Sequence, residues 1–261
     1  MSSVPTQAVL QEMFDRVQMH TVSVFSIRAL QDRGVYSGTG ILVYAKGPCL
    51  LTAAHVWDLL NERKPESFGL TGRAREGQKG IAVPTSLQVA RHRGTRLEPD
   101  IALIRLPEID ASTAQIGGKV FYNLDRRRAE ADVSDSAPSL WGVFGSPGEQ
   151  VAPSEAEQQW LMGTGIFASY AAPLRSERDG FDYAEIRTWN DGRDGRPQSY
   201  AGLSGSGLWR LGVRQQEGAV VWDGSLTLEG VAFYQEYDTQ AKRGIIRCHG
   251  RKSIYRVVDG A

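Results

Sequence analysis

Residues 38–55 read GTGILVYAKGPCLLTAAH, and this stretch decides what kind of fold the chain can adopt. It contains two short apolar runs, 41–45 and 49–51, with Gly and Pro between them. Short runs rich in β-branched and aromatic residues, bounded by Gly and Pro, predict β-strands. We therefore expect strands here, the second of which leads through small residues to His55 at its end.

Similar short apolar runs, bounded by turn-forming residues, recur along most of the chain. No strand alternates with a long helix, which argues against a parallel α/β sheet, whereas many short strands with frequent turns favour a β-barrel or sandwich. Apolar residues at helical spacing in 6–17 predict one short N-terminal helix. The last segment, 252–258, fits a helix or a strand. The other expected strands are 21–30, 101–106, 139–145, 184–189, 219–222, 228–234 and 244–248.

Composition limits the classes of partner. The 261 residues are enough to bury roughly three quarters of the unfolded surface, so a large core can form without disulfides or metal ions to stabilise it. Thirty Lys and Arg balance thirty Asp and Glu, so we expect neither nucleic acid nor a membrane as partner. The two cysteines, Cys49 and Cys248, match no metal-ligand spacing, and we expect both to stay reduced. With no signal-peptide pattern at the start, these features predict a cytoplasmic location.

One histidine and one aspartate lie where chemistry is plausible. His20, His92 and His249 have ordinary structural or solvated settings, whereas His55 follows a buried strand and small residues. Asp100 directly precedes the apolar run 101–106. A carboxylate at the edge of a core needs a hydrogen-bond partner or an ion pair, and a histidine would meet that need. The residues alone leave the alternatives open: a core histidine and a turn aspartate.

A third stretch, GLSGSGLW at 202–209, raises the question of a nucleophilic serine. Neither Ser204 nor Ser206 fits the G-x-S-x-G elbow of α/β hydrolases, and the residues that follow look like a strand rather than a helix. The chain order is His55, Asp100, Ser204, which is the order found in chymotrypsin and not in subtilisin.

Together, TAAH, DIALIRL and GLSGSG resemble the motifs of chymotrypsin-like (trypsin-like) serine peptidases. GTG before the TAAH strand and the GSPG run at 145–148 resemble bacterial members. The resemblance implies an all-β fold of two antiparallel β-barrels with a short N-terminal helix. It implies a first lobe at 1–125 carrying His55 and Asp100, and a second lobe at 126–261 carrying Ser204, the two forming one peptidase domain.

Residue by residue, the resemblance implies that Ser204 is the nucleophile, His55 the general base, and Asp100 the group that orients it. The backbone N–H groups of Gly202 and Ser204 would form the oxyanion hole, and Ser206 would have no role in catalysis. No cofactor and no metal are implied.

The chain departs from the animal digestive members in two places. Leu203 stands where those enzymes have an Asp that pairs with a newly cleaved N-terminus, so we expect no activation by N-terminal cleavage. The neutral Gln198, at the expected base of the specificity pocket, supplies no counter-charge for Arg or Lys. The substrate-binding residues implied by the alignment are Gln198, Phe233, Tyr234, Gln235 and Gly244.

The function expected from these features is a serine endopeptidase that acts on a protein or peptide substrate. A regulated intracellular effector protease with a regulatory protein partner is the biological role we expect. The alternative is a catalytically quiet trypsin-like scaffold that binds proteins. A metal-dependent hydrolase is set aside, because the chain has no ligand pair such as H-E-x-x-H.

Overall fold

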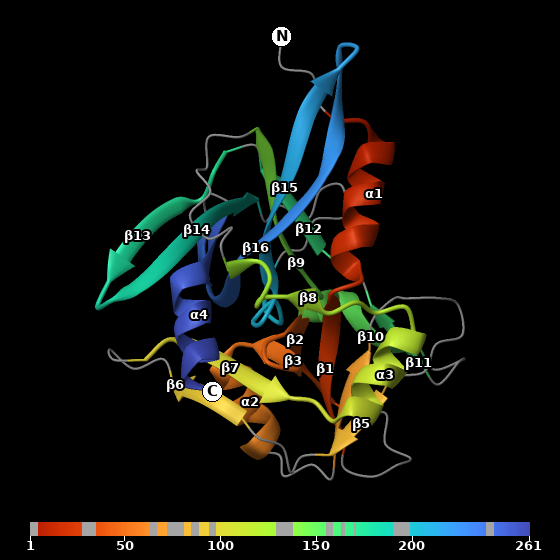
Figure 1. The fold of residues 1–261 in the computed structure, drawn as a ribbon, viewed down its shortest axis with the longest axis vertical. Coiled ribbons are helices and arrows are strands. Elements are labelled where there is room, and N and C mark those ends of the chain that lie inside the picture. The colour runs from red at the N-terminus through yellow and green to blue at the C-terminus, as the bar shows by residue number, and fades with distance from the viewer. Residues whose placement is uncertain are drawn as a thin grey trace.

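Strands form most of the described chain, and they assemble into two large sheets that follow one another in the sequence (Figure 1). The structure is a computed structural model. It describes residues 5–27, 35–62, 67–71, 81–84, 89–93, 98–128, 138–154, 159–162, 165–169, 171–189, 199–238 and 243–261. The predicted all-β class, with two antiparallel units and a short N-terminal helix, is confirmed by this arrangement.

The first sheet has the strand order β5–β4–β1–β2–β3–β7–β6, with β8 paired to β2. All the pairings in that order are antiparallel, and only the short β2–β8 pairing is parallel. β3 is buried along its whole length and β2 along most of it, as expected for the two apolar runs of 38–55. The strands are β1 (Thr21–Ile27), β2 (Val35–Tyr44), β3 (Pro48–Thr52), β4 (Ser67–Thr71), β5 (Ile81–Pro84), β6 (Val89–Arg93), β7 (Asp100–Arg105) and β8 (Tyr122–Asn123).

The second sheet has the order β12–β9–β15–β16–β17–β14–β13 and is antiparallel throughout. Its longest strand, β16, joins two runs that the sequence suggested as separate strands, because both runs pair with β15. The strands are β9 (Ser139–Gly145), β12 (Gly165–Ser169), β13 (Leu174–Arg178), β14 (Phe181–Trp189), β15 (Gly207–Gln216), β16 (Ala219–Asp238) and β17 (Arg243–Gly250), and β10 (Val151–Ser154) pairs separately with β11 (Gln159–Met162).

Four α-helices pack around the sheets within the described residues. They are α1 (Gln7–Gln18), α2 (Ala54–Glu62), α3 (Glu108–Ile116) and α4 (Arg251–Gly260). The predicted N-terminal helix is α1, and the ambiguous last segment is the helix α4. The helices α2 and α3 were not predicted. α2 is held by its apolar face rather than by a strong sequence signal, since Ala54, Val56, Trp57 and Leu60 are buried.

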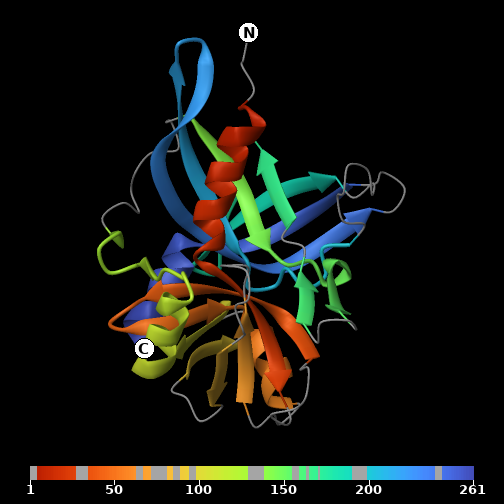
Figure 2. The same ribbon diagram turned by 90° about the vertical axis from the view of Figure 1, so that its right-hand side faces the viewer.

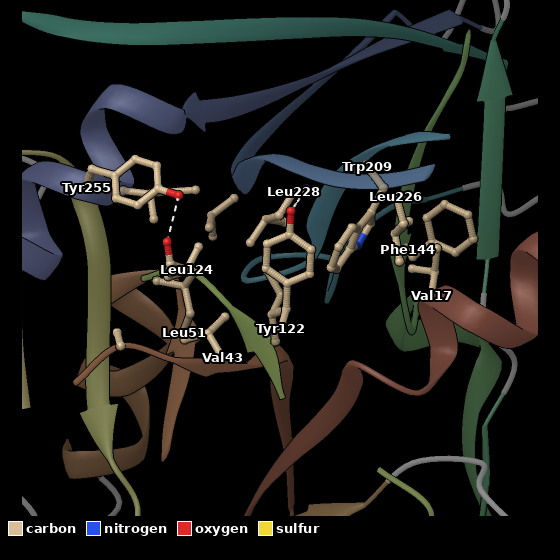
Figure 3. Close-up of a cluster of buried hydrophobic side chains, with 14 of the residues drawn as sticks. Val17, Val43, Leu51, Tyr122, Leu124, Phe144, Trp209, Leu226, Leu228 and Tyr255 are labelled. Carbon is tan, nitrogen blue, oxygen red and sulfur yellow. Dashed lines mark hydrogen bonds between the residues drawn. The ribbon is translucent and has the colours of Figure 1, made fainter. Parts of the chain in front are cut away.

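Side chains from both sheets and from two helices meet in one central core (Figure 3). Val43 and Leu51 come from the first sheet, and Trp209 and Leu228 from the second. Tyr122 joins the layers, because its hydroxyl accepts a hydrogen bond from the Leu228 backbone N–H at 3.2 Å. Burying side chains of this size stabilises a fold by about 1.5–3 kcal/mol each, so this core holds the two sheets in a defined relation.

The helices at the two ends of the chain cross between the halves. α1 contacts β16 of the second sheet as well as β1 of the first, and Figure 2 shows it lying across the second sheet. α4 contacts β6 and β7 on one side and β14, β16 and β17 on the other. The division into lobes at 1–125 and 126–261 stays a prediction. Among the described helices, none has the length and apolar character that a bilayer crossing requires.

Candidate active site

His55 and Asp100 form a pair that uses both oxygens of the carboxylate. The imidazole Nδ1 lies 2.6 Å from Asp100 Oδ2, and the His55 backbone N–H donates to Asp100 Oδ1 at 2.9 Å. Sheet register explains the meeting: β3 runs antiparallel to β7 with Thr52 opposite Ala102, so the residues just beyond β3 lie beside the start of β7. The sequence had suggested that His55 lies at the end of a strand. In the structure it lies in the first turn of α2 instead.

This pair sets the basicity of the imidazole. The pKa of His55 is raised above its ordinary value, first by the hydrogen bond to Asp100, against an opposing effect of burial. The His55 side chain is 48% exposed and that of Asp100 is 17% exposed. With Nδ1 donating to the carboxylate, Nε2 of neutral His55 keeps its lone pair for a proton from another group. The arrangement is that of an oriented general base.

The turn that carries Ser204 is bonded through its backbone to β2 of the first sheet and to β16 of the second. The Ser204 carbonyl accepts from the Thr39 N–H at 3.0 Å, and the next N–H, of Gly205, donates to the Ala232 carbonyl at 2.7 Å. Gly205 has φ +87°, and a Cβ there would lie 1.9 Å from the Thr39 carbonyl oxygen and 2.2 Å from Thr52 Oγ1. Only glycine fits this contact, so the second glycine of GLSG docks the turn on the strand that leads to His55.

Ser204 also lies next to the helix that carries His55. A Cβ built on Gly38 would meet Val56 Cγ2 at 2.9 Å and the Ser204 carbonyl oxygen at 3.1 Å, so one point on β2 touches both residues. Within the part of the chain that the structure describes, Ser204 Oγ makes no hydrogen bond to His55. The structure thus brings the serine turn beside the histidine helix without closing the bond between the two side chains.

The neighbouring serine has a different environment. Ser206 is fully buried, and within the described ranges its Oγ has no hydrogen-bond partner. A Cβ at Gly145 would lie 1.8 Å from that Oγ, so the Ser206 side chain points at β9. Ser204, in contrast, is half-buried. Of the two serines in the turn, only Ser204 has access to solvent.

The backbone before Ser204 has a shape suited to anion binding. The Ala201 carbonyl accepts from the Gly148 N–H at 2.6 Å, and a trans peptide directs the following N–H, that of Gly202, the opposite way. Gly202 has φ +93°, and its own carbonyl accepts from the Tyr36 hydroxyl at 2.8 Å. Among the described residues, the N–H groups of Gly202 and Ser204 have no hydrogen-bond partner. They remain available as a pair of donors.

A cavity of about 700 Å³ opens beside the His55–Asp100 pair. Phe233 and Tyr234 line it, whereas Gln235 lies further along β16 and Gly244 lies on β17 opposite Tyr237. Gln198 lies outside the described residues. Ser204 is not part of this lining. The remaining lining comes mainly from the β13–β14 hairpin and includes Glu177, Asp179 and Glu185. In the described ranges, no group of His, Cys, Asp and Glu is arranged to hold a metal ion.

One residue of the cavity had no signal in the sequence. His249, on β17, accepts a hydrogen bond at its Nε2 from the Asp100 backbone N–H at 2.9 Å. From its sequence context alone, His249 was expected to be an ordinary structural histidine. The two residues are far apart in the chain, and no local motif links them, so only the fold reveals the contact.

Cys49 and Cys248 are free and buried, on β3 and β17 respectively. Burial raises the pKa of the Cys49 thiol to about 11 and raises that of Cys248 further. Both groups are therefore protonated thiols at neutral pH, with little nucleophilic character.

No family model and no curated protein matches the chain. Among solved structures, the chain is similar to the crystal structure of the active form of the Rv3671c protease from M. tuberculosis. The sequence identity is 15%, and the match covers 99% of this chain and 87% of that chain. The TM-score is 0.48, an overlap too loose to carry an argument about function. The function must therefore be argued from the residues themselves.

Proposed function

We propose that the chain is a serine endopeptidase that works through a Ser204–His55–Asp100 triad. The observation that carries this proposal is the two-point bond between Asp100 and His55, made beside a turn whose Ser204 adjoins the helix of His55. A histidine oriented by a partly buried carboxylate, next to a solvent-accessible serine, is the arrangement that activates a serine hydroxyl.

In the proposed reaction, Ser204 Oγ attacks the carbonyl carbon of a peptide bond while His55 Nε2 takes the hydroxyl proton. Asp100 holds the tautomer with the proton on Nδ1 and stabilises the imidazolium that forms. The His55 proton then passes to the leaving amine, and a water molecule hydrolyses the acyl-enzyme by the reverse route. The hydrogen bond between Ser204 and His55 would tighten when substrate binds, since such bonds are often long in free enzymes.

The developing oxyanion would be stabilised by the N–H groups of Gly202 and Ser204. The bond from the Gly148 N–H to the Ala201 carbonyl supports this assignment, because across a trans peptide the Gly202 N–H then points away from Gly148. Two donors held by the fold need no reorganisation as charge develops, and losing one of them typically costs about 3–4 kcal/mol. Residues of an extended peptide on one side of the scissile bond would occupy the 700 Å³ cavity beside His55.

The alternative is a catalytically quiet scaffold that binds a protein partner. The observation that favours it is the missing Ser204–His55 hydrogen bond among the described residues. A fluorophosphonate probe separates the two functions, because it reacts only with an activated serine. Mass spectrometry of the labelled protein should find the adduct on Ser204 alone. A chain that stays unlabelled at high probe concentration while binding a partner would favour the scaffold.

Two matched variants test which serine reacts. Ser204→Ala should lower kcat for a cleaved peptide by roughly 10⁴–10⁶-fold, as loss of a triad member does. Ser206→Ala should stay within about threefold of the parent, because the Ser206 hydroxyl has no partner to lose. A diverse peptide library, read by mass spectrometry, would supply the substrate. Equal losses in the two variants would contradict the assignment of Ser204.

For its cellular setting, we propose a reducing compartment such as the bacterial cytoplasm, where two free buried thiols would persist. A regulatory protein partner would gate the activity there. Comparison of kcat for the purified chain with kcat in lysate would reveal such a partner.

A further inference from the structure

Asp100 is held by two histidines, one on each side. Its carboxylate bonds to His55, and its backbone N–H donates to His249 Nε2. The second bond joins the two sheets, because Asp100 begins β7 of the first sheet and His249 lies near the end of β17 of the second. Hydrogen bonds therefore fix both the side chain and the main chain of Asp100.

The His249 ring is itself held firmly in place. Its side chain is buried, with the residue 3% exposed. The Phe233 ring stacks on it with centroids 4.1 Å apart and an interplanar angle of 24°, and the Tyr183 ring lies 5.1 Å away. The strands on both sides fix its backbone, since His249 is opposite Val231 on β16 and Tyr183 on β14.

The protonation state of His249 suits a hydrogen-bond acceptor. Burial lowers its pKa to about 4, although the negative charges of Asp100 and Asp182 oppose that shift. Above this pKa the ring is neutral. Because Nε2 accepts from the Asp100 N–H, the single proton is on Nδ1, which is buried and has no hydrogen-bond partner among the residues that the structure describes. The ring therefore accepts at the atom that faces Asp100.

The same part of the second sheet also holds the serine turn. Ala232, next to Val231 on β16, accepts from the Gly205 N–H and donates to the Ser206 carbonyl. Val231 is the residue opposite His249. Backbone hydrogen bonds and strand pairing thus connect the serine turn through β16 to His249. The hydrogen bond at His249 Nε2 then connects His249 to Asp100.

We propose that His249 is a positioning residue, whose Nε2 sets the place of Asp100, and through it of His55, relative to the turn that carries Ser204. This inference rests on the proposed function. A general base must be aligned closely with the nucleophile, and a displacement of about 1 Å can lower a rate by roughly 10²-fold. His249 does not touch the reacting atoms in this scheme; it lines the cavity beside His55, and the role proposed for it is exerted through Asp100.

Two variants separate the hydrogen bond from the packing. His249→Phe keeps an aromatic ring for the stack on Phe233 but has no acceptor for the Asp100 N–H. His249→Gln carries an amide oxygen close to the position of Nε2 and restores an acceptor. We expect kcat of the Phe variant to fall by roughly 10–100-fold with KM within about twofold, and kcat of the Gln variant to stay within about threefold of the parent.

The pKa of His55, followed by an NMR titration of the histidine ring protons, tests the same idea without catalysis. The hydrogen bond to Asp100 is the main cause of the raised pKa, so a loosened Asp100 should let it fall. We expect the fall in the Phe variant and not in the Gln variant. A merely structural role for His249 would lower thermal stability in both variants and leave the pKa of His55 unchanged.

Failure of the inference and failure of the proposed function give different results. If the parent chain does not react with a fluorophosphonate, the endopeptidase proposal fails, and the NMR titration still decides the positioning role. If the parent reacts and the Phe variant keeps its kcat and the parent pKa of His55, the positioning role is wrong. A fall in kcat without a fall in that pKa overturns it equally. If His249→Phe does not fold, as judged by circular dichroism, His249→Leu replaces it as the variant without an acceptor.

Discussion

His55 and His249 both contact Asp100, and yet the fold drives their pKa values in opposite directions. His55 is half exposed and bonds to the carboxylate, so its pKa is raised. His249 is buried and bonds only to the backbone N–H, so desolvation dominates and its pKa falls to about 4. One aspartate thus has an imidazole of raised pKa on one side and, on the other, an imidazole that is neutral at neutral pH. The difference follows from burial, which lowers the pKa of His249, and from the carboxylate hydrogen bond, which raises the pKa of His55.

The largest expected effect comes from removing the basic member of the pair. His55→Ala should lower kcat by roughly 10⁴–10⁶-fold, because no other group is held to take the Ser204 proton. His249→Gln, a change to the other histidine, should stay within about threefold of the parent, as argued above. Steady-state kinetics on a library-derived peptide measures both. Comparable losses would mean that the two histidines do not differ in role.

Asp100→Asn should come next in size. The amide keeps the shape and the backbone bond to His249 but removes the acceptor that selects the tautomer of His55, so kcat should fall by roughly 10⁴-fold. The pKa of His55, measured by NMR, should fall as well. Asp179→Asn is the matched control, since Asp179 lines the same cavity and is exposed. A similar loss in that control would point to the charge of the whole cavity rather than to Asp100.

Leu203→Asp tests what burial does to a carboxylate that has no partner of opposite charge. Leu203 is buried in an apolar cluster with Trp141, Val143 and Leu208. A carboxylate there should destabilise the fold by roughly 3 kcal/mol or more, and its charge next to the oxyanion donors should lower kcat too. Urea unfolding at several pH values measures the loss.

The pH dependence and a control complete the Leu203 test. Burial raises the pKa of such an Asp in the folded chain, so the destabilisation should grow as pH rises above about 4. Leu203→Met, which keeps the volume, should cost less than about 1.5 kcal/mol. Greater activity in the Asp variant than in the parent would contradict both effects.

The smallest effect concerns stability in acid. A histidine whose folded pKa is lowered binds fewer protons folded than unfolded between that pKa and its ordinary value of 6.5. Stability is therefore complete above 6.5 and falls as pH drops toward about 4, by at most about 1.4 kcal/mol per pH unit for one proton. His20, which is half-buried and has a pKa lowered to about 4 by desolvation, adds a second such contribution.

His249→Gln should remove roughly half of this acid dependence, since the glutamine does not titrate and His20 remains. The free energy of unfolding, measured in urea at pH 7, 6 and 5, gives the slope for the parent and the variant. An unchanged slope would mean that His249 is already charged in the folded chain, which would end its contrast with His55.

The sequence by itself was sufficient for the features that local patterns encode. Runs of β-branched and aromatic residues between turn residues predicted the strands, because such side chains fit the pleated surface of a sheet. His55, Asp100 and Ser204 were selected as candidates in the same way, because each lies within a short motif. Their catalytic roles remain predictions, but the bond between His55 and Asp100 is a feature of the fold.

Other features depended on residues far apart in the chain. Helix α2 forms because its apolar face finds a core to pack against, and nine residues without that core would not hold a helix. The contact between His249 and Asp100 requires the end of β17 to approach the start of β7, and nothing near either residue encodes that approach. The opposite pKa shifts of the two histidines are likewise tertiary, because burial and hydrogen-bond partners are created only when the two sheets come together.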